Sequence, residues 1–142
     1  MVRLKYGPTI QQSIEAKYVY NSTLSNLMKE YVKVIYNIDN YYILSAKYGI
    51  IHNSKKIENY NISFYDKDKC ITINKIKEIL PIELKDINEV IFIGGNLYKE
   101  ILSNIFTNII CPIPSLSMGY MIQYLQKEIR QNNTKTNNLF EF

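Results

Sequence analysis

Side chains able to do chemistry gather where the apolar run of residues 41–44 ends. Ser45, Lys47 and Tyr48 follow that run, and Gly49 then allows the backbone to turn back. A lysine here could pair with a phosphate or, once desolvated, act as an amine nucleophile at a sugar C1′, as in lyase-type base excision. The serine and tyrosine hydroxyls could hydrogen-bond a base or a phosphate, and the tyrosine ring could stack on a flipped-out base. The alternatives are a surface lysine and a buried tyrosine whose hydroxyl has a partner.

Glu58 is the best carboxylate in the chain for activating water or stabilising an oxocarbenium-like transition state, because Tyr60 follows it in a stretch without regular periodicity. An exposed loop glutamate explains the same residue equally well. His52 could act as an acid or a base near neutral pH. A single histidine without partner ligands is more often incidental, because catalysis requires a defined and oriented geometry.

A second group of candidates follows the apolar run of residues 89–93. Gly94, Gly95 and Asn96 separate this run from a helical pattern that includes Tyr98. A strand, glycines and a helix N-terminus in this order present backbone N–H groups to an anion. The alternative is tight strand-to-helix packing, because a two-glycine turn alone is a weak motif. The candidate catalytic residues are therefore Glu58 and Lys47, and the candidate ligand-binding residues are Ser45, Tyr48, Gly49, Tyr60, Gly94, Gly95, Asn96 and Tyr98.

The elements that must hold these residues follow from hydrophobic spacing. The two uninterrupted apolar runs predict strands that are buried on both faces, as in a parallel sheet. Residues 50–70 lack periodicity and predict a long connection of the kind that often binds ligands. Further short strands are predicted at 2–6 and 108–112, and helices within 24–35, 71–80, 97–105 and 118–129.

This order of elements predicts an α/β fold, a three-layer single domain with a small, mostly parallel four-stranded sheet flanked by helices. A chain of 142 residues forms one domain by length. We assign residues 1–130 to that domain and expect residues 131–142, which are rich in Asn and Thr, to form a flexible polar tail. Parallel sheets bind ligands outside the carboxyl ends of their strands, so the candidate residues are expected at that edge.

Composition sets wide limits on function. The net charge of +4 and the pI near 8.9 are compatible with a polyanionic partner, although a mildly basic solvated surface explains them at least as well. The 13 tyrosines accompany abundant Ile, Asn and Lys, which is typical of an AT-rich genome and does not by itself indicate a stacking surface. Two cysteines and one histidine are too few for a disulfide framework or a zinc site, and no apolar stretch is long enough to span a membrane. We therefore expect a cytoplasmic protein without a metal or a cofactor.

Five blocks occur in a fixed order: 16–22 (Ala-Lys-Tyr-Val-Tyr-Asn-Ser), 43–51 (Ile-Leu-Ser-Ala-Lys-Tyr-Gly-Ile-Ile), 57–60 (Ile-Glu-Asn-Tyr), 93–98 (Ile-Gly-Gly-Asn-Leu-Tyr) and 118–121 (Met-Gly-Tyr-Met). Together they resemble the YaaA-like family, which is largely described as of unknown function, over residues 16–125. The Leu-Ser-Ala-Lys-Tyr-Gly block is the most specific part. The resemblance implies a fold related to uracil-DNA glycosylases. It also implies neighbours concerned with DNA binding under oxidative stress, modified-base excision and 7-deazaguanine tRNA modification.

Two departures from the family pattern bear on activity. The family usually opens with a strand that ends in a Cys-Ser-x-x-Lys-like turn, whereas this chain has Leu-Lys-Tyr-Gly-Pro at residues 4–8 and lacks the cysteine. The usual Glu-Pro-Tyr appears here as Glu58-Asn59-Tyr60. If the cysteine has a chemical role in relatives, this chain binds a ligand without turning it over.

The first functional hypothesis is a protein that acts on DNA, tRNA or a nucleotide-like base and hydrolyses or exchanges an N-glycosidic bond. Glu58 would assist water or the developing charge, Lys47 and the glycine turn would hold phosphate, and Tyr48 or Tyr60 would stack on the base. No metal is needed, because a held carboxylate and preorganised dipoles can stabilise the charge. The second hypothesis is a non-catalytic DNA- or RNA-binding protein that uses the same edge. The third is an oligomeric scaffold or a viral accessory protein.

Overall fold

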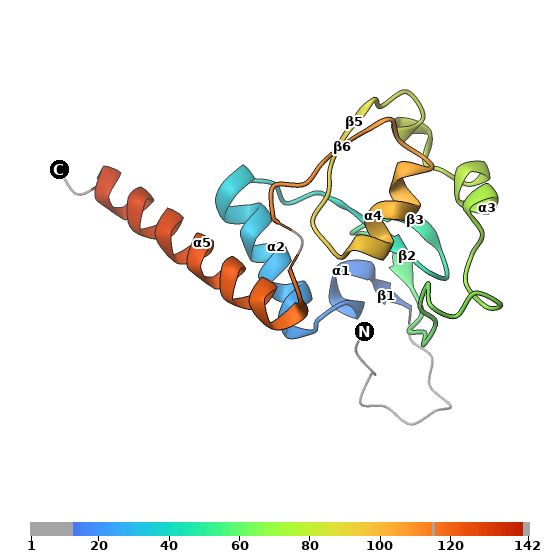
Figure 1. Cartoon of the computed structure of the whole chain (residues 1–142), viewed down its shortest axis with the longest axis horizontal. Coiled ribbons are helices and arrows are strands. Elements are labelled where there is room, and N and C mark those ends of the chain that lie inside the picture. Colours follow the sequence, from blue (N-terminus) through green and yellow to red (C-terminus); the bar gives the residue numbers. More distant parts are fainter. Residues whose placement is uncertain (1–12, 115, 141–142) are drawn as a thin grey trace.

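In a computed structural model that describes residues 13–114 and 116–140, the strands of these residues form three separate sheets of two strands each (Figure 1). Residues 134–140 are described by their backbone only. The first strand predicted from the sequence, residues 2–6, lies outside the described residues. The helices pack around and beside these small sheets rather than on the two faces of one larger sheet.

The central apolar run forms one arm of a hairpin. Strands β2 (Tyr42–Ser45) and β3 (Gly49–His52) are antiparallel, with Ser45 paired with Gly49. Gly49 has φ of 78°, in the left-handed region that glycine adopts without steric cost. This geometry ends a three-residue turn and sends the chain straight back along β2.

The predicted four-stranded, mostly parallel sheet of the uracil-DNA glycosylase-like type is therefore wrong for the described residues. The antiparallel return of β3 gives β2 a local partner in place of a parallel neighbour. The strand β1 (Ile14–Glu15) pairs in the antiparallel sense with β4 (Lys56–Ile57). The β2–β3 pair closes through a turn of three residues, so its pairing costs little loop-closure entropy.

Parallel pairing occurs between β5 (Glu89–Ile91) and β6 (Asn108–Ile110). Helix α4 (Asn96–Ser103) connects the two strands, as in a βαβ unit. The prediction of strand, helix and strand in this part of the chain is confirmed, although both strands are shorter than predicted.

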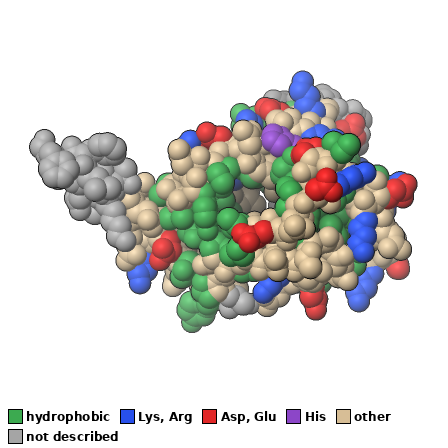
Figure 2. All heavy atoms as spheres, turned by 90° about the horizontal axis from the view of Figure 1, so that it is seen from above, with side chains coloured by type: hydrophobic (Ala, Val, Ile, Leu, Met, Phe, Trp, Pro, Cys, Tyr) green, Lys and Arg blue, Asp and Glu red, His purple; other side chains and the backbone are tan. Residues whose placement is uncertain are grey.

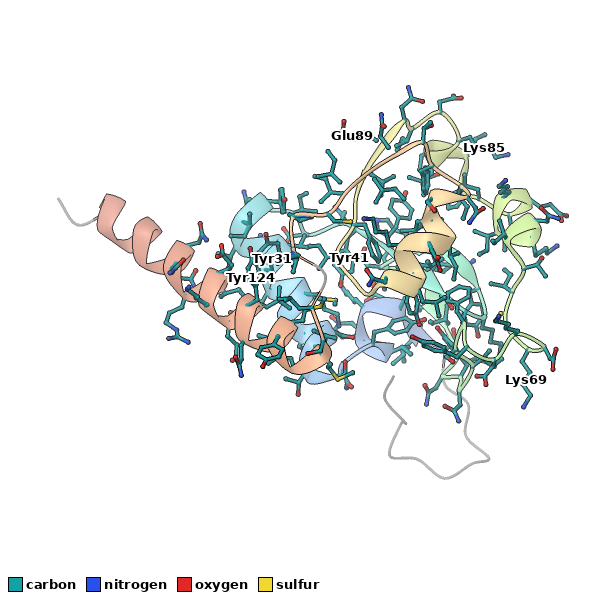
Figure 3. The ribbon with its side chains drawn as sticks, viewed as in Figure 1. Tyr31, Tyr41, Lys69, Lys85, Glu89 and Tyr124 are labelled. Carbon is teal, nitrogen blue, oxygen red and sulfur yellow. The ribbon has the colours of Figure 1, made fainter. Side chains whose placement is uncertain are left out.

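Two helices form a pair at one side of the molecule. Helix α2 (Thr23–Tyr36) is capped at its N-terminus by Ser22, whose hydroxyl accepts a hydrogen bond from the Ser25 amide at 3.1 Å. It packs against α5 (Met118–Phe140), and Figure 3 shows Tyr31 and Tyr124 where the two helices meet. The predicted polar tail from residue 131 onward lies in α5 as far as Phe140.

The remaining elements are short. Helix α1 (Ala16–Val19) follows β1 directly, outside the segments in which a helix is predicted. Helix α3 (Ile73–Glu78) confirms the helix predicted within 71–80, and the Thr72 hydroxyl caps it by accepting from the Lys75 amide. The 3-10 helix η1 (Ile82–Leu84) follows.

The apolar side chains form three clusters rather than one continuous core. One surrounds Ile76 under the β2–β3 hairpin and α4, a second surrounds Leu125 between α2 and α5, and the third holds α1 against β3 and β4. Among the helices of the described part of the chain, none combines the length and the apolar character needed to cross a membrane.

The turn that ends at Gly49 provides a test of the hairpin. We predict that Gly49→Ala lowers the free energy of unfolding by about 1–2 kcal/mol, because an L-residue is strained in the left-handed region. A Cβ atom at this position would meet Ile71 and Ile79 at ordinary contact distances of 3.5 Å, so the cost comes from the backbone. The measurement is urea unfolding followed by circular dichroism.

Gly119→Ala is the matched control, because Gly119 lies in α5 and nothing approaches its Cβ position within 4 Å. This substitution should leave stability unchanged or raise it slightly. Equal unfolding midpoints for Gly49→Ala and the unmodified protein would contradict the hairpin geometry.

Candidate functional site

The hydroxyl of Ser45 is fully buried at the end of β2, with an exposed fraction of 0%. Its Oγ accepts hydrogen bonds from the backbone N–H groups of Lys47 at 3.2 Å and Tyr48 at 3.0 Å. It donates its proton to the hydroxyl of Tyr60 at 2.8 Å. Ser45 therefore shapes the turn and at the same time links the turn to the loop that follows β4.

Tyr20 contributes a third hydroxyl to this site, from a segment near the start of the described residues. It follows α1, and its hydroxyl makes a hydrogen bond with the hydroxyl of Tyr60. The ring of Tyr60 packs edge-on against Tyr20 at 6.1 Å and against Tyr48 at 5.6 Å between ring centroids. We call Tyr20, Ser45 and Tyr60 the hydroxyl cluster, with the Tyr48 ring beside it.

Backbone and lysine hydrogen bonds fix the position of α1, which carries Tyr20. The Ala16 amide donates to the Lys55 carbonyl at 2.8 Å, and the Lys17 amide donates to the Asn53 carbonyl at 2.9 Å. The Lys29 ammonium, which comes from α2, donates to the carbonyls of Lys17 and Tyr20. These carbonyls at the end of α1 lack partners within the helix, so the lysine stabilises the position of Tyr20.

Helix α4 brings a third phenol to the same region. Tyr98 packs against Phe64 with ring centroids 5.2 Å apart, and it lies close enough to Tyr20 and Tyr60 to influence their ionisation. Figure 1 agrees with this proximity, because the start of α4 lies next to α1. The first turn of α4 therefore borders the hydroxyl cluster.

The two glycines before α4 differ in their surroundings. A Cβ atom on Gly94 would lie 2.5 Å from the ring of Phe92, so Gly94 serves the tight packing that was the alternative interpretation. Gly95 is exposed, nothing lies within 4 Å of its Cβ position, and it is the N-cap of α4 without a side-chain hydrogen bond at the cap. The open backbone at Gly95 suits the binding of an anion. The close packing at Gly94 gives no evidence for or against anion binding.

Burial disfavours ionisation of the phenols in this region. Desolvation, together with the nearby Tyr60, raises the pKa of Tyr20 far above its ordinary value of 10.0. Desolvation also raises the pKa of Tyr98. The same cause lowers the pKa of Lys29. At neutral pH the site therefore presents uncharged hydroxyl groups, which both donate and accept hydrogen bonds.

The two candidate catalytic residues lie at the surface beside the cluster and do not form a pair. The Lys47 side chain is exposed, and its Nζ lies 5.3 Å from the centroid of the Tyr48 ring. The Glu58 side chain is exposed as well, while its backbone carbonyl accepts a hydrogen bond of 3.4 Å from the Tyr48 hydroxyl. Neither side chain forms an ion pair with another described residue.

His52 lies at the other end of the β2–β3 hairpin, opposite Tyr42. Its Nδ1 accepts a hydrogen bond from the Ser54 amide at 3.1 Å and lies 2.6 Å from the Ser54 hydroxyl. Tyr42 donates to Glu83 at 2.5 Å, and desolvation together with that carboxylate raises its pKa to about 12. His52 therefore belongs to a separate surface group and not to the hydroxyl cluster.

Tyr20 is the residue that sequence reasoning missed as a site residue. It lies in the block of residues 16–22, which carries part of the family resemblance, but its partner Tyr60 is 40 residues away in the chain. Spacing within a segment cannot show such a contact. Within the described residues, no group of three or more His, Cys, Asp or Glu side chains could hold a metal ion.

The comparisons with known proteins give one match. Residues 9–127 match DUF6884, which is described as a family of unknown function. No curated protein and no solved structure matches the chain. The matched range includes the hydroxyl cluster and α4, and it provides no link to YaaA-like or uracil-DNA glycosylase-like proteins.

The contribution of the Ser45 hydroxyl to stability can be tested by replacing the serine with alanine. We predict that Ser45→Ala lowers the free energy of unfolding by about 1–3 kcal/mol, because two backbone N–H groups and the Tyr60 hydroxyl lose a buried partner. Ser103→Ala is the control, since the Ser103 hydroxyl is exposed and bonds only the Glu100 carbonyl of its own helix. Urea unfolding of both variants measures the difference, and equal midpoints would show that the Ser45 hydrogen bonds contribute little.

The raised pKa of Tyr20 predicts a pH dependence of stability. As the pH rises above 10.0, the tyrosine ionises in the unfolded chain while the folded protein still holds its proton. The stability that is present below this pH is therefore lost progressively above it. Tyr20→Phe removes one such group, so the fall in unfolding free energy between about pH 9 and about pH 11 should be smaller in this variant.

Tyr36→Phe provides the control for this experiment, because Tyr36 lies on α2 against Tyr31 and outside the hydroxyl cluster. An identical loss of stability with pH in Tyr20→Phe and in the unmodified protein would contradict the neutral, buried state of Tyr20.

Proposed function

The chain belongs to the DUF6884 family, whose function is unknown, and from its own site we propose that it is a nucleic-acid-associated protein that binds a base at the hydroxyl cluster. The observation that carries this proposal is the convergence of Ser45, Tyr60 and Tyr20, with the Tyr48 ring beside them. Hydrogen-bonding groups next to aromatic faces are the means by which proteins hold an unstacked base.

The surface beside the cluster supports a place for the backbone of a nucleic acid. The ammonium of Lys47 is exposed above the Tyr48 ring, where it can meet a phosphate. The first turn of α4 begins at the open position of Gly95. Helix N-termini favour anions because their N–H groups point outward and the helix dipole is positive there.

The distribution of charge predicts modest electrostatic attraction. Figure 2 shows Lys and Arg side chains scattered around one face of the molecule and interleaved with Asp and Glu, rather than gathered in one patch. Figure 3 likewise places Lys85 and Lys69 far apart on the same side of the molecule. Contacts with the base would then carry more of the affinity than contacts with phosphate, as in binding that relies on stacking.

Cleavage or exchange of an N-glycosidic bond is the second candidate function. Neutral phenols that donate hydrogen bonds can stabilise the negative charge that develops on a departing base. Glu58, two residues before Tyr60 in the chain, has an exposed side chain, and its backbone carbonyl accepts from the Tyr48 hydroxyl; its carboxylate would assist the developing positive charge or a water. A protein that binds a base without releasing it remains the non-catalytic alternative.

The test is a titration of the protein with labelled single-stranded DNA, double-stranded DNA and tRNA over a series of salt concentrations, with free base assayed in the same samples. We predict binding that weakens as salt rises. Lys47→Ala should reduce the slope of log K against log salt by about 0.7 for a single strand, since one phosphate contact is lost.

Lys85→Ala is the matched control, because Lys85 is an exposed lysine near η1 and away from the cluster. It should leave the slope at the value of the unmodified protein. Base release that is lost when Glu58 is replaced would support the enzymatic function. Binding without base release would support the non-catalytic binding function only. Absence of binding to all three nucleic acids would refute the proposal.

A further inference from the structure

The hydroxyl cluster contains one proton more than its own acceptors can use. The two N–H groups of Lys47 and Tyr48 occupy both lone pairs of Ser45 Oγ, so this hydroxyl must donate, and its proton goes to Tyr60. One proton, from either Tyr20 or Tyr60, fills the hydrogen bond between the two phenols. The other phenolic proton then has no acceptor among the described residues.

The surplus donor is confined to a partly buried place. Ser45 is fully buried, Tyr20 and Tyr60 are partly buried, and the rings of Tyr48 and Tyr60 pack edge-on. A donor that is partly withdrawn from water and has no acceptor in the protein is incompletely satisfied, so a ligand that brings an acceptor to this place gains affinity. Burial also raises the pKa of Tyr20, so this phenol keeps its proton well into the alkaline range.

The acceptor that fits is a neutral one. Lys29 uses its ammonium on the backbone carbonyls of Lys17 and Tyr20, and the Lys47 ammonium lies above the Tyr48 ring. No cationic side chain of the described residues donates a hydrogen bond to the three hydroxyls of the cluster. A phosphate oxygen there would be desolvated without a countercharge, whereas a carbonyl oxygen needs only the phenolic proton.

Building on the proposed function, we infer that the hydroxyl cluster recognises the carbonyl oxygen of an oxo-base. A base with an exocyclic carbonyl, such as hypoxanthine, satisfies the surplus donor. A base with an amino group at the same position, such as adenine, presents a donor there and cannot accept the phenolic proton at that position. The site therefore distinguishes bases by their hydrogen-bonding edge as well as by stacking.

The test uses three short single-stranded DNAs of equal length, in which every base is hypoxanthine, every base is adenine or every nucleotide is abasic. All three carry the same phosphate charge, and the adenine strand contains no base carbonyl. We expect the hypoxanthine strand to bind about tenfold more tightly than the adenine strand, which corresponds to one buried hydrogen bond. The abasic strand should bind least tightly.

The double substitution Tyr20→Phe with Tyr60→Phe removes both phenolic donors while keeping both rings. It should bind the hypoxanthine and adenine strands equally, whereas the control Tyr36→Phe should keep the preference. Circular dichroism and thermal unfolding check that each variant folds. The comparison of strands on the unmodified protein does not depend on any variant.

The possible results separate this inference from the proposed function. Equal affinity for the hypoxanthine and adenine strands, both above the abasic strand, would overturn the inference and leave base binding intact. Equal affinity for all three would assign the contact to phosphate and also overturn the inference. A preference that survives the double substitution would place recognition elsewhere, and no binding to any strand would overturn both the inference and the proposed function.

Discussion

The rest of the site depends on the hydrogen bonds of the Ser45 hydroxyl. This one oxygen accepts from two backbone N–H groups of the turn and donates to Tyr60, so it fixes the turn and the following loop together. Tyr60 then holds Tyr20 at the end of α1. Because a serine oxygen has two lone pairs and one proton, these contacts use its full capacity, and the direction of hydrogen bonding through the cluster follows from that saturation.

The same interaction links local structure to the proposed function. Gly49 lets the chain reverse immediately after the turn, which places Ser45 at the closed end of a hairpin and not at the open end of a parallel strand. The cluster is therefore bordered by α1, the loop after β4 and α4, which are three segments far apart in the sequence. Lys29 supports this assembly from α2 by binding the carbonyls at the end of α1. A base-binding role needs this kind of rigid support, because loose polar groups gain little from a ligand.

Part of this structure could be predicted from the sequence. Apolar residues at helical spacing predicted α2, and the order of strand, helix and strand between residues 89 and 110 was confirmed. The parallel four-stranded sheet was wrong because an apolar run without alternation fits a hairpin arm as well as a strand covered on both faces. The signal for the hairpin was present, since five residues that end in Gly49 separate two apolar runs. The contact of Tyr20 with Tyr60 spans 40 residues, and no local pattern indicates it. The separate roles of Gly94 and Gly95 likewise depend on the position of the Phe92 ring, which only the fold determines.

The central claim is that a base binds at the hydroxyl cluster, and the most direct measurement is NMR of protein labelled with carbon-13 at the Cζ atom of tyrosine. This carbon carries the hydroxyl group, so its chemical shift reports the hydrogen bonding of each phenol. On addition of a hypoxanthine strand, the account predicts that the Cζ signals of Tyr20 and Tyr60 shift, together with that of Tyr48. Shifts confined to exposed tyrosines such as Tyr18, Tyr65 and Tyr120 would contradict it, because the strand would then lie on the surface and leave the cluster untouched.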